Sequence, residues 1–106
     1  MKAKPYKLID KEYRPCNPNE ATHVELNMPG PIPFRMIPVI LKGSRKDTEC
    51  WSWNGNTERP TLKPSILTQR PNVKCHTWVN DGKAQFLDDC SHELAGQTVE
   101  LLEVEE

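Results

Sequence analysis

Long apolar runs are absent from this sequence of 106 residues. No run approaches the ~20 apolar residues that a membrane-spanning helix needs, so we expect no membrane segment. The first residues, 1–5, carry two lysines, but no apolar stretch follows them. This pattern excludes a secretory signal and favours a cytoplasmic protein. In a reducing cytoplasm, cysteines more often bind metal or stay reduced than form disulfides.

Hydrophobic residues are also scarce, at 36% of the chain, which is below the share usual for globular proteins. A chain of 106 residues suffices for one small domain, whose core we expect to be thin. The chain has ten prolines and only five glycines. A proline inside a helix removes a backbone hydrogen-bond donor and clashes with the preceding turn. Long helices are therefore excluded, and the thin core needs a staple such as a metal ion.

An excess of charge of one sign is absent as well, because 14 basic side chains face 15 acidic ones. General nucleic-acid binding depends on a strong basic excess, so the sequence excludes it. A discrete protein surface or a small nucleotide ligand is the kind of partner that this balance allows, and a homo-oligomer is compatible with it.

The apolar segments that are present are short, and several alternate with polar residues as strands do. Residues 1–22 are polar and broken by three prolines, so we expect an N-terminal arm or irregular segment there. Residues 23–106 are expected to form a single metal-stapled β domain. Its fold class is all-β: a small sandwich or open barrel of about six or seven short antiparallel strands with very little helix. Pro38 marks 36–41 as an edge strand, and a polar turn is expected at 43–47.

The dipeptide Asp81-Gly82 lies between two β-prone runs, which is a strong hairpin signal. A two-residue turn would pair Val79 with Ala84. Alternation then places Cys75 on one face of the hairpin and the neighbouring histidine on the other. A longer loop would shift the register by one residue and exchange the two.

Four potential metal ligands gather around this hairpin: Cys75, His76, Cys90 and His92. Zinc takes about four nitrogen or sulfur ligands in a tetrahedron. Because neighbours on a regular strand point in opposite directions, we favour Cys75, Cys90 and His92 as ligands of a structural zinc ion. The fourth ligand would be His76, a water molecule, or one of the more distant residues Cys16, His23 and Cys50.

Other interpretations of these residues stay open. Cys75 and Cys90 could be buried as small hydrophobic side chains, or they could form a disulfide. A metal ion with a bound water would permit hydrolysis, with Asp88 or Asp89 as the base. Small β domains with cysteine-rich sites are more often structural, so we expect no catalytic residue.

A second candidate site lies in the tryptophan segment. Trp51 and Trp53 alternate onto one face of a strand and could simply fill the core. Alternatively they could form a platform on which a nucleotide base stacks, with polar contacts from Asn54 and Arg59. We expect residues 60–65, with two prolines, to form a rigid extended connection.

Several motifs follow one another in fixed order over residues 51–102: W-S-W-N-G at 51–55, P-T-L-K-P-S at 60–65, C-H at 75–76 and D-C-S-H-E-L-A-G-Q-T-V at 89–99. This half of the chain resembles a family of small phage and prophage proteins that often carry the label ammonia monooxygenase. It is also distantly similar to a predicted metal-binding family found beside bacterial ubiquitin-like conjugation genes. The monooxygenase label is excluded here, because no copper or di-iron ligand set is present.

The resemblance implies a small metal-binding β protein of a phage, working in the host cytoplasm. We therefore expect a zinc-stabilised binding module directed against a host component, with an anti-defence role. One alternative is a sponge for a nucleotide immune signal, and another is a small metal-dependent hydrolase.

Overall fold

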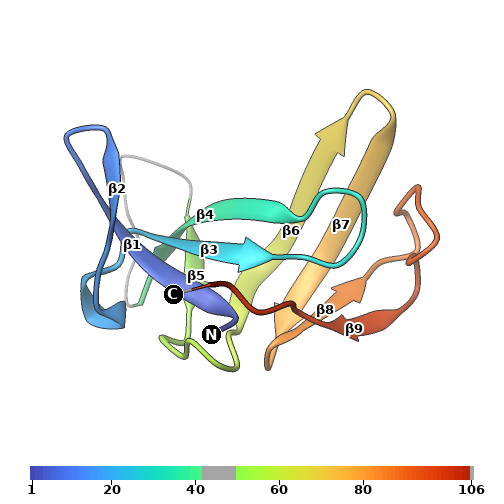
Figure 1. Ribbon diagram of the computed structural model, residues 1–106. Coiled ribbons are helices and arrows are strands. Elements are labelled where there is room, and N and C mark those ends of the chain that lie inside the picture. The colour runs from blue at the N-terminus through green and yellow to red at the C-terminus, as the bar shows by residue number, and fades with distance from the viewer. Residues whose placement is uncertain (42–49, 106) are drawn as a thin grey trace.

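The computed structural model describes residues 1–41 and 50–105 of the chain, so the turn expected at 43–47 lies outside the described residues. One mixed sheet in the order β2-β1-β3-β4-β5-β6-β7-β8-β9 makes up the fold (Figure 1). A 3₁₀ turn, η1 (Pro18–Glu20), is the helical element of the described residues, and no helix there is long and apolar enough to cross a bilayer. The strands are β1 (Ala3–Ile9), β2 (Glu12–Pro15), β3 (His23–Asn27), β4 (Phe34–Ile40), β5 (Trp51–Trp53), β6 (Leu62–Arg70), β7 (Val73–Asn80), β8 (Lys83–Phe86) and β9 (Thr98–Glu100).

The all-β prediction is confirmed, but the described residues form nine strands instead of six or seven, and one pair is parallel among antiparallel ones. Two segments also differ from their predictions. The polar segment expected to be an arm contributes β1 and β2, because β1 pairs with both β2 and β3. The strand that contains Pro38 lies inside the sheet instead of at its edge, where β4 pairs antiparallel with β3 and parallel with β5. Pro38 is tolerated because the pairing with β5 involves only Val39 and Ile40.

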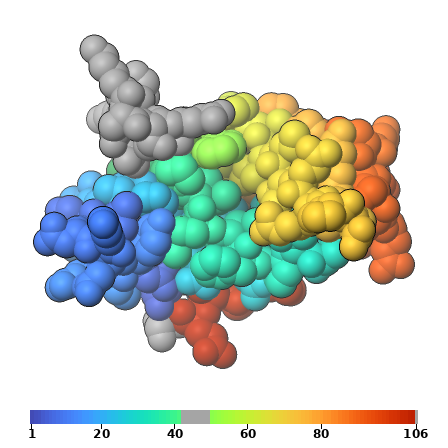
Figure 2. All heavy atoms as spheres, turned by 90° about the horizontal axis from the view of Figure 1, so that it is seen from above, coloured from blue at the N-terminus to red at the C-terminus, as the bar shows by residue number. Residues whose placement is uncertain are grey.

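The sheet curls around the core and brings the C-terminal segment back to the start of the chain and the end of β3. The segment after β9 runs beside the start of the chain, where the Leu102 N–H donates to the Asn27 carbonyl and the Val104 N–H donates to the Met1 carbonyl. Figure 1 accordingly draws the two termini close together. Seen from above in Figure 2, the N-terminal strands lie at one end and the β6–β7 hairpin with the C-terminal loop lies at the other.

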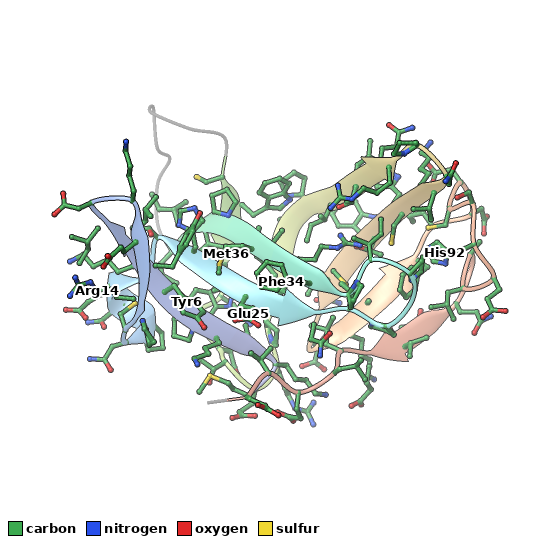
Figure 3. All side chains as sticks on the ribbon, turned by 45° about the horizontal axis from the view of Figure 1, so that its top comes forward. Tyr6, Arg14, Glu25, Phe34, Met36 and His92 are labelled. Atoms are coloured by element: carbon green, nitrogen blue, oxygen red, sulfur yellow. The ribbon has the colours of Figure 1, made fainter. Side chains whose placement is uncertain are left out.

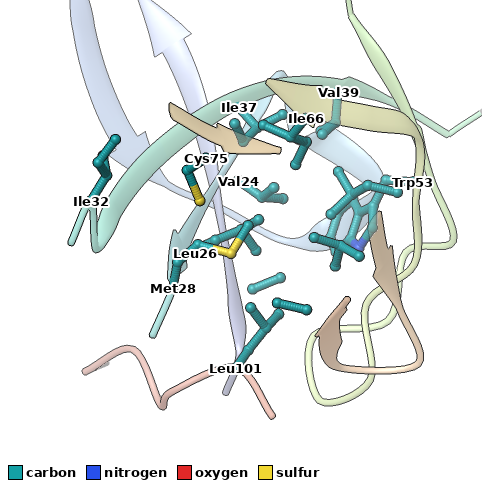
Figure 4. Packing of buried hydrophobic residues seen from close by; sticks show 14 of the residues in the cluster. Val24, Leu26, Met28, Ile32, Ile37, Val39, Trp53, Ile66, Cys75 and Leu101 are labelled. Carbon is teal, nitrogen blue, oxygen red and sulfur yellow. The ribbon is translucent and has the colours of Figure 1, made fainter. Parts of the chain in front are cut away.

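Buried apolar side chains from both halves of the sheet fill the space between them (Figure 4). The largest fully buried ones include Phe86, Leu26, Met28 and Leu62. Polar pairs lie on the outside, as Figure 3 shows for Tyr6 and Glu25 on neighbouring strands. Strands such as β4, β7 and β8 therefore have a core face and an outer face.

The β7–β8 hairpin follows the predicted register. Asp81 and Gly82 have φ angles of 51° and 77°, the positive values that a two-residue turn of this kind needs, and Val79 pairs with Ala84. Cys75 lies on the buried core face of β7, and His76 is half-buried on the outer face. This alternation sends two adjacent residues to two different sites.

Candidate active site

Ser65 lies at an irregularity between β6 and β7. Leu62 pairs with Val79 and Ile66 pairs with Thr77, so residues 63–65 of β6 lie opposite a single residue of β7. Bulges of this kind turn a side chain away from the direction that regular alternation would give it. The Ser65 Oγ atom lies 2.9 Å from Nε2 of His76 on the neighbouring strand.

The other ring nitrogen of His76 faces a carboxylate. Its Nδ1 atom lies 3.1 Å from Oδ2 and 3.2 Å from Oδ1 of Asp89, which follows β8 in a turn. A hydroxyl, an imidazole and a carboxylate are thus hydrogen-bonded in series. We call Ser65, His76 and Asp89 the triad.

The environment of Asp89 keeps its carboxylate charged. Lys74 Nζ lies 3.1 Å from Asp89 Oδ2, and the hydrogen bonds from Lys74 and His76 lower the pKa of this carboxyl below its usual value. An ionised carboxylate can only accept hydrogen bonds, so His76 Nδ1 must carry the proton in this pair. Nε2 is then free to accept the proton of the Ser65 hydroxyl, which is the arrangement that activates a serine.

On the core side of β7 lies a separate group, Cys75, Cys90 and His92, which we call the Cys/His cluster. One ligand atom of each residue lies within 4.8 Å of the others. Cys75 is 1% exposed and Cys90 is 9% exposed, and Figure 4 shows Cys75 pointing into the core. Nε2 of His92 is buried and has no hydrogen-bond partner among the described residues. Three soft donors that converge in this way could hold a metal ion.

A buried cation lies close to the Cys/His cluster. Burial raises the pKa of the Cys75 thiol, and the nearby Arg35 guanidinium works in the opposite direction. Arg35 is itself 4% exposed, and it donates through Nε to the Ile32 carbonyl and through a terminal nitrogen to Thr68. A positive charge beside the thiol favours its thiolate form, which is the form that binds metal.

The structure brings together the three zinc ligands favoured by the sequence and leaves out the others. His76 is engaged with Ser65 and Asp89 on the opposite face of β7. His23 hydrogen-bonds Thr22 and packs edge-on against a tyrosine ring. Neither Cys16 nor Cys50 belongs to the cluster. All four cysteines are free thiols, so no disulfide joins Cys75 to Cys90.

The tryptophan segment supports the core and the loop beside it. Trp53 is 3% exposed in the core, and half-buried Trp51 donates from Nε1 to the Ser65 carbonyl. Asn54 bonds backbone groups of its own loop, and exposed Arg59 pairs with Asp81. Trp53 and Asn54 line one hollow and Arg59 lines another, so a nucleotide site formed by these residues stays a prediction.

An open hollow of about 300 Å³ lies beside the triad on the outer face. Trp78 is two residues from His76 along β7, and Lys63 is two residues from Ser65 along β6. Both side chains are exposed. The hollow is lined by Thr61, Leu62, Lys63, Trp78, Val79, Asn80 and Gln85.

The sequence analysis missed Ser65, which it placed in a rigid connection. It assigned His76 to the metal and considered Asp89 only as a base beside a metal-bound water. One signal was available: strand alternation places His76 opposite to Cys75, so the histidine needed a different partner. The partner itself depends on the β6–β7 register, which no local pattern predicts.

Comparison with known proteins gives one family. Residues 34–87, about half of the chain, match the model described as "Bacterial ubiquitination-like system serine protease (BubE)". The matched segment contains Ser65 and His76, and Asp89 lies two residues beyond it. Neither the comparison with curated proteins nor that with solved structures gives a match.

This match corrects two predictions. The assignment to the phage protein family is wrong, and so is the anti-defence binding module that depended on it, because the matched family is one of serine proteases. The gene neighbourhood of the more distant resemblance, bacterial ubiquitin-like conjugation, is the one that the family description names. The match supports a hydrolase, the class of the second alternative, over a binding module.

Proposed function

Because this chain belongs to the BubE family of serine proteases of bacterial ubiquitination-like systems, we propose that it is a serine protease whose nucleophile is Ser65. His76 acts as general base and acid, and Asp89 orients the imidazole. The observation that carries the proposal is the unbroken series of hydrogen bonds from Ser65 Oγ through His76 to Asp89. An isolated serine is a poor nucleophile at neutral pH, and this arrangement is the one that activates it.

The chemistry follows from where the protons lie. Ser65 Oγ bonds to the scissile carbonyl carbon as its proton passes to His76 Nε2. When the C–N bond breaks, the amine leaves with that proton and an acyl-serine remains. A water molecule then gives a proton to Nε2 and attacks the acyl carbon. The bond from the acyl carbon to Oγ breaks, Nε2 returns its proton to Oγ, and the acid leaves. Asp89 stays ionised throughout and stabilises the imidazolium that forms at each step.

The hollow beside the triad is the place we propose for substrate side chains. It opens on the same outer face of β6 and β7, and the exposed Trp78 ring forms part of its wall.

Covalent labelling with a fluorophosphonate tests the proposal, because such probes react with activated serines. We expect stoichiometric labelling that maps to Ser65. Ser65→Ala has no hydroxyl at this position, so its labelling should be lost and its rate of peptide hydrolysis should fall by roughly 10⁶-fold. Ser52→Ala is the matched control, since Ser52 is an exposed serine on the neighbouring strand β5. Its labelling should equal that of the wild type. An adduct on another residue, or undiminished labelling of Ser65→Ala, would overturn the assignment.

We further propose that the Cys/His cluster binds a structural zinc ion. Thiolate and imidazole are the ligands zinc prefers, the three donors converge, and the buried Nε2 of His92 needs a partner. Native mass spectrometry of the purified chain should detect one zinc per chain that a chelator removes, with a fall in Tm. A metal-free chain whose Tm does not respond to zinc would contradict this site.

A further inference from the structure

The Cys/His cluster and the triad are interleaved along the chain. Cys75 directly precedes His76, and Cys90 directly follows Asp89. The two thiols point toward the core, while His76 and Asp89 meet on the outer side. Each of these two triad residues is therefore bonded through the backbone to one member of the cluster.

Cys90 is also tied directly to the catalytic histidine. Its Sγ atom lies 3.2 Å from the backbone N of His76, which donates to it, and 3.2 Å from the His76 carbonyl oxygen. Sulfur forms weak hydrogen bonds, so these contacts alone hold the turn loosely. A thiolate has no proton to donate to the His76 carbonyl, but it would still accept from the His76 N–H, and a metal ion would hold it in place.

Among the described residues, the Asp89 carboxylate is held by the side chains of Lys74 and His76 alone, and the Asp89 side chain is 44% exposed. The turn that carries it contains no strand between Phe86 and Thr98. Backbone bonds attach this turn to β7 at both sides of Asp89, from Leu87 to the His76 carbonyl and from Ser91 to the Lys74 carbonyl.

From this geometry we infer that a metal ion bound by Cys75, Cys90 and His92 clamps the turn onto β7 and so holds Asp89 in line with His76. Metal occupancy would then regulate the protease without the metal touching the substrate. The inference rests on the proposed serine protease function. His92, two residues after Cys90, completes the clamp, and its ring packs edge-on against that of Phe86 at 5.3 Å (Figure 3).

The experiment compares zinc-loaded, chelated and zinc-reloaded wild-type chain with two readouts. One is the rate at which a fluorophosphonate labels Ser65. The other is the NMR signal of the His76 Nδ1 proton, which reports the bond to Asp89 whether or not the serine reacts. After chelation we expect labelling to slow by about tenfold or more and the Nδ1 signal to broaden or vanish. Added zinc should restore both.

Two variants separate the clamp from general destabilisation. His92→Ala removes one ligand but leaves both thiols and the bonds between Cys90 and His76, so it should lose zinc and mimic the chelated chain in both readouts. Val104→Ala is the matched control. It removes buried apolar atoms from the C-terminal segment, away from the cluster, and should lower Tm while zinc content and labelling rate stay unchanged.

Each result decides the question. Equal labelling and an unchanged Nδ1 signal in the chelated chain would refute the clamp and leave the protease intact. Loss of labelling in parallel with the far-UV circular dichroism of the sheet would also refute it, because the metal would then hold the whole fold. If zinc-loaded wild type is not labelled at all, the protease proposal fails. The clamp is then supported by a metal-dependent Nδ1 signal and refuted by a metal-independent one.

Discussion

Replacing Asp89 with asparagine tests the triad at its orienting carboxylate. In the wild type both carboxylate oxygens lie within hydrogen-bond distance of His76 Nδ1, so the ring keeps its proton on that nitrogen. An asparagine of the same shape presents an NH₂ group as well as an oxygen. When the NH₂ group faces Nδ1, the ring proton moves to Nε2, and Nε2 can no longer accept the proton of Ser65.

The expected loss of activity is large, because a histidine with its proton on Nε2 cannot act as the base for Ser65. In Ser-His-Asp enzymes, the same substitution lowers kcat by about 10⁴-fold, and we expect a loss of this order here. Asp89 is 44% exposed and the replacement is isosteric, so the fold and Tm should change little. A loss of activity without a loss of stability is the signature of an orienting group.

The assay is the second-order rate of fluorophosphonate labelling, measured together with Tm. Asp88→Asn is the matched control, since it changes the neighbouring exposed carboxylate and should label as fast as the wild type. If Asp89→Asn labels within about tenfold of the wild type, Asp89 does not orient His76 and the triad is refuted. An equal loss in Asp88→Asn would likewise contradict the assignment.

Three further predictions concern the hollow, the core and an ion pair. Trp78→Ala should raise KM for a peptide substrate by about tenfold with little change in kcat, because its ring lines the hollow without touching the triad; an equal fall in kcat would contradict this. Phe86→Ala should lower the free energy of unfolding, measured with urea, by about 3–5 kcal/mol, because Phe86 is 1% exposed. It should also weaken zinc binding, because the Phe86 ring packs against His92. Phe86→Leu should lower the free energy of unfolding by less. Lys2→Met should raise the pKa of Glu100 toward its ordinary value in an NMR titration, because Lys2 holds the pKa of that carboxyl down in the wild type; an unmoved midpoint would exclude the pair.

The stability contribution of this ion pair has a definite sign. The pKa of Glu100 is lower in the folded chain than in the unfolded one, so its contribution is present above the unfolded pKa. It is lost as the pH falls through the folded pKa. Both side chains lie near the surface, so solvent screens the pair and the effect on overall stability should be small.

Local patterns predicted much of the C-terminal half. The turn at Asp81-Gly82 requires positive φ angles, which glycine adopts freely and aspartate tolerates, so the hairpin and its register could be read from the chain. The register in turn placed Cys75 on the core face with His76 opposite to it. The burial of Trp53 likewise agrees with the simpler of its two interpretations.

Pairing between distant segments could not be predicted in this way. Polar β1 is held between β2 and β3, and its place depends on partners that its own composition does not reveal. Pro38 argued for an edge, yet β4 lies inside the sheet because β5 joins it beyond the proline. Hydrogen bonds across a sheet link residues far apart in sequence, and hydrophobic alternation does not name the partner strand.

The sequence by itself predicted an all-β chain with a thin core and too many prolines for long helices, a hairpin whose register follows from a two-residue turn, and a set of cysteine and histidine donors in and after that hairpin. These features depend on residue chemistry and on period-two alternation, which act over a few neighbouring residues. Only the tertiary structure decided that Ser65 meets His76. A bulge in β6 and a turn after β8 bring a serine, a histidine and an aspartate from three segments to one point on the outer face. Such a meeting depends on distances between strands, and these exist only once the sheet has formed.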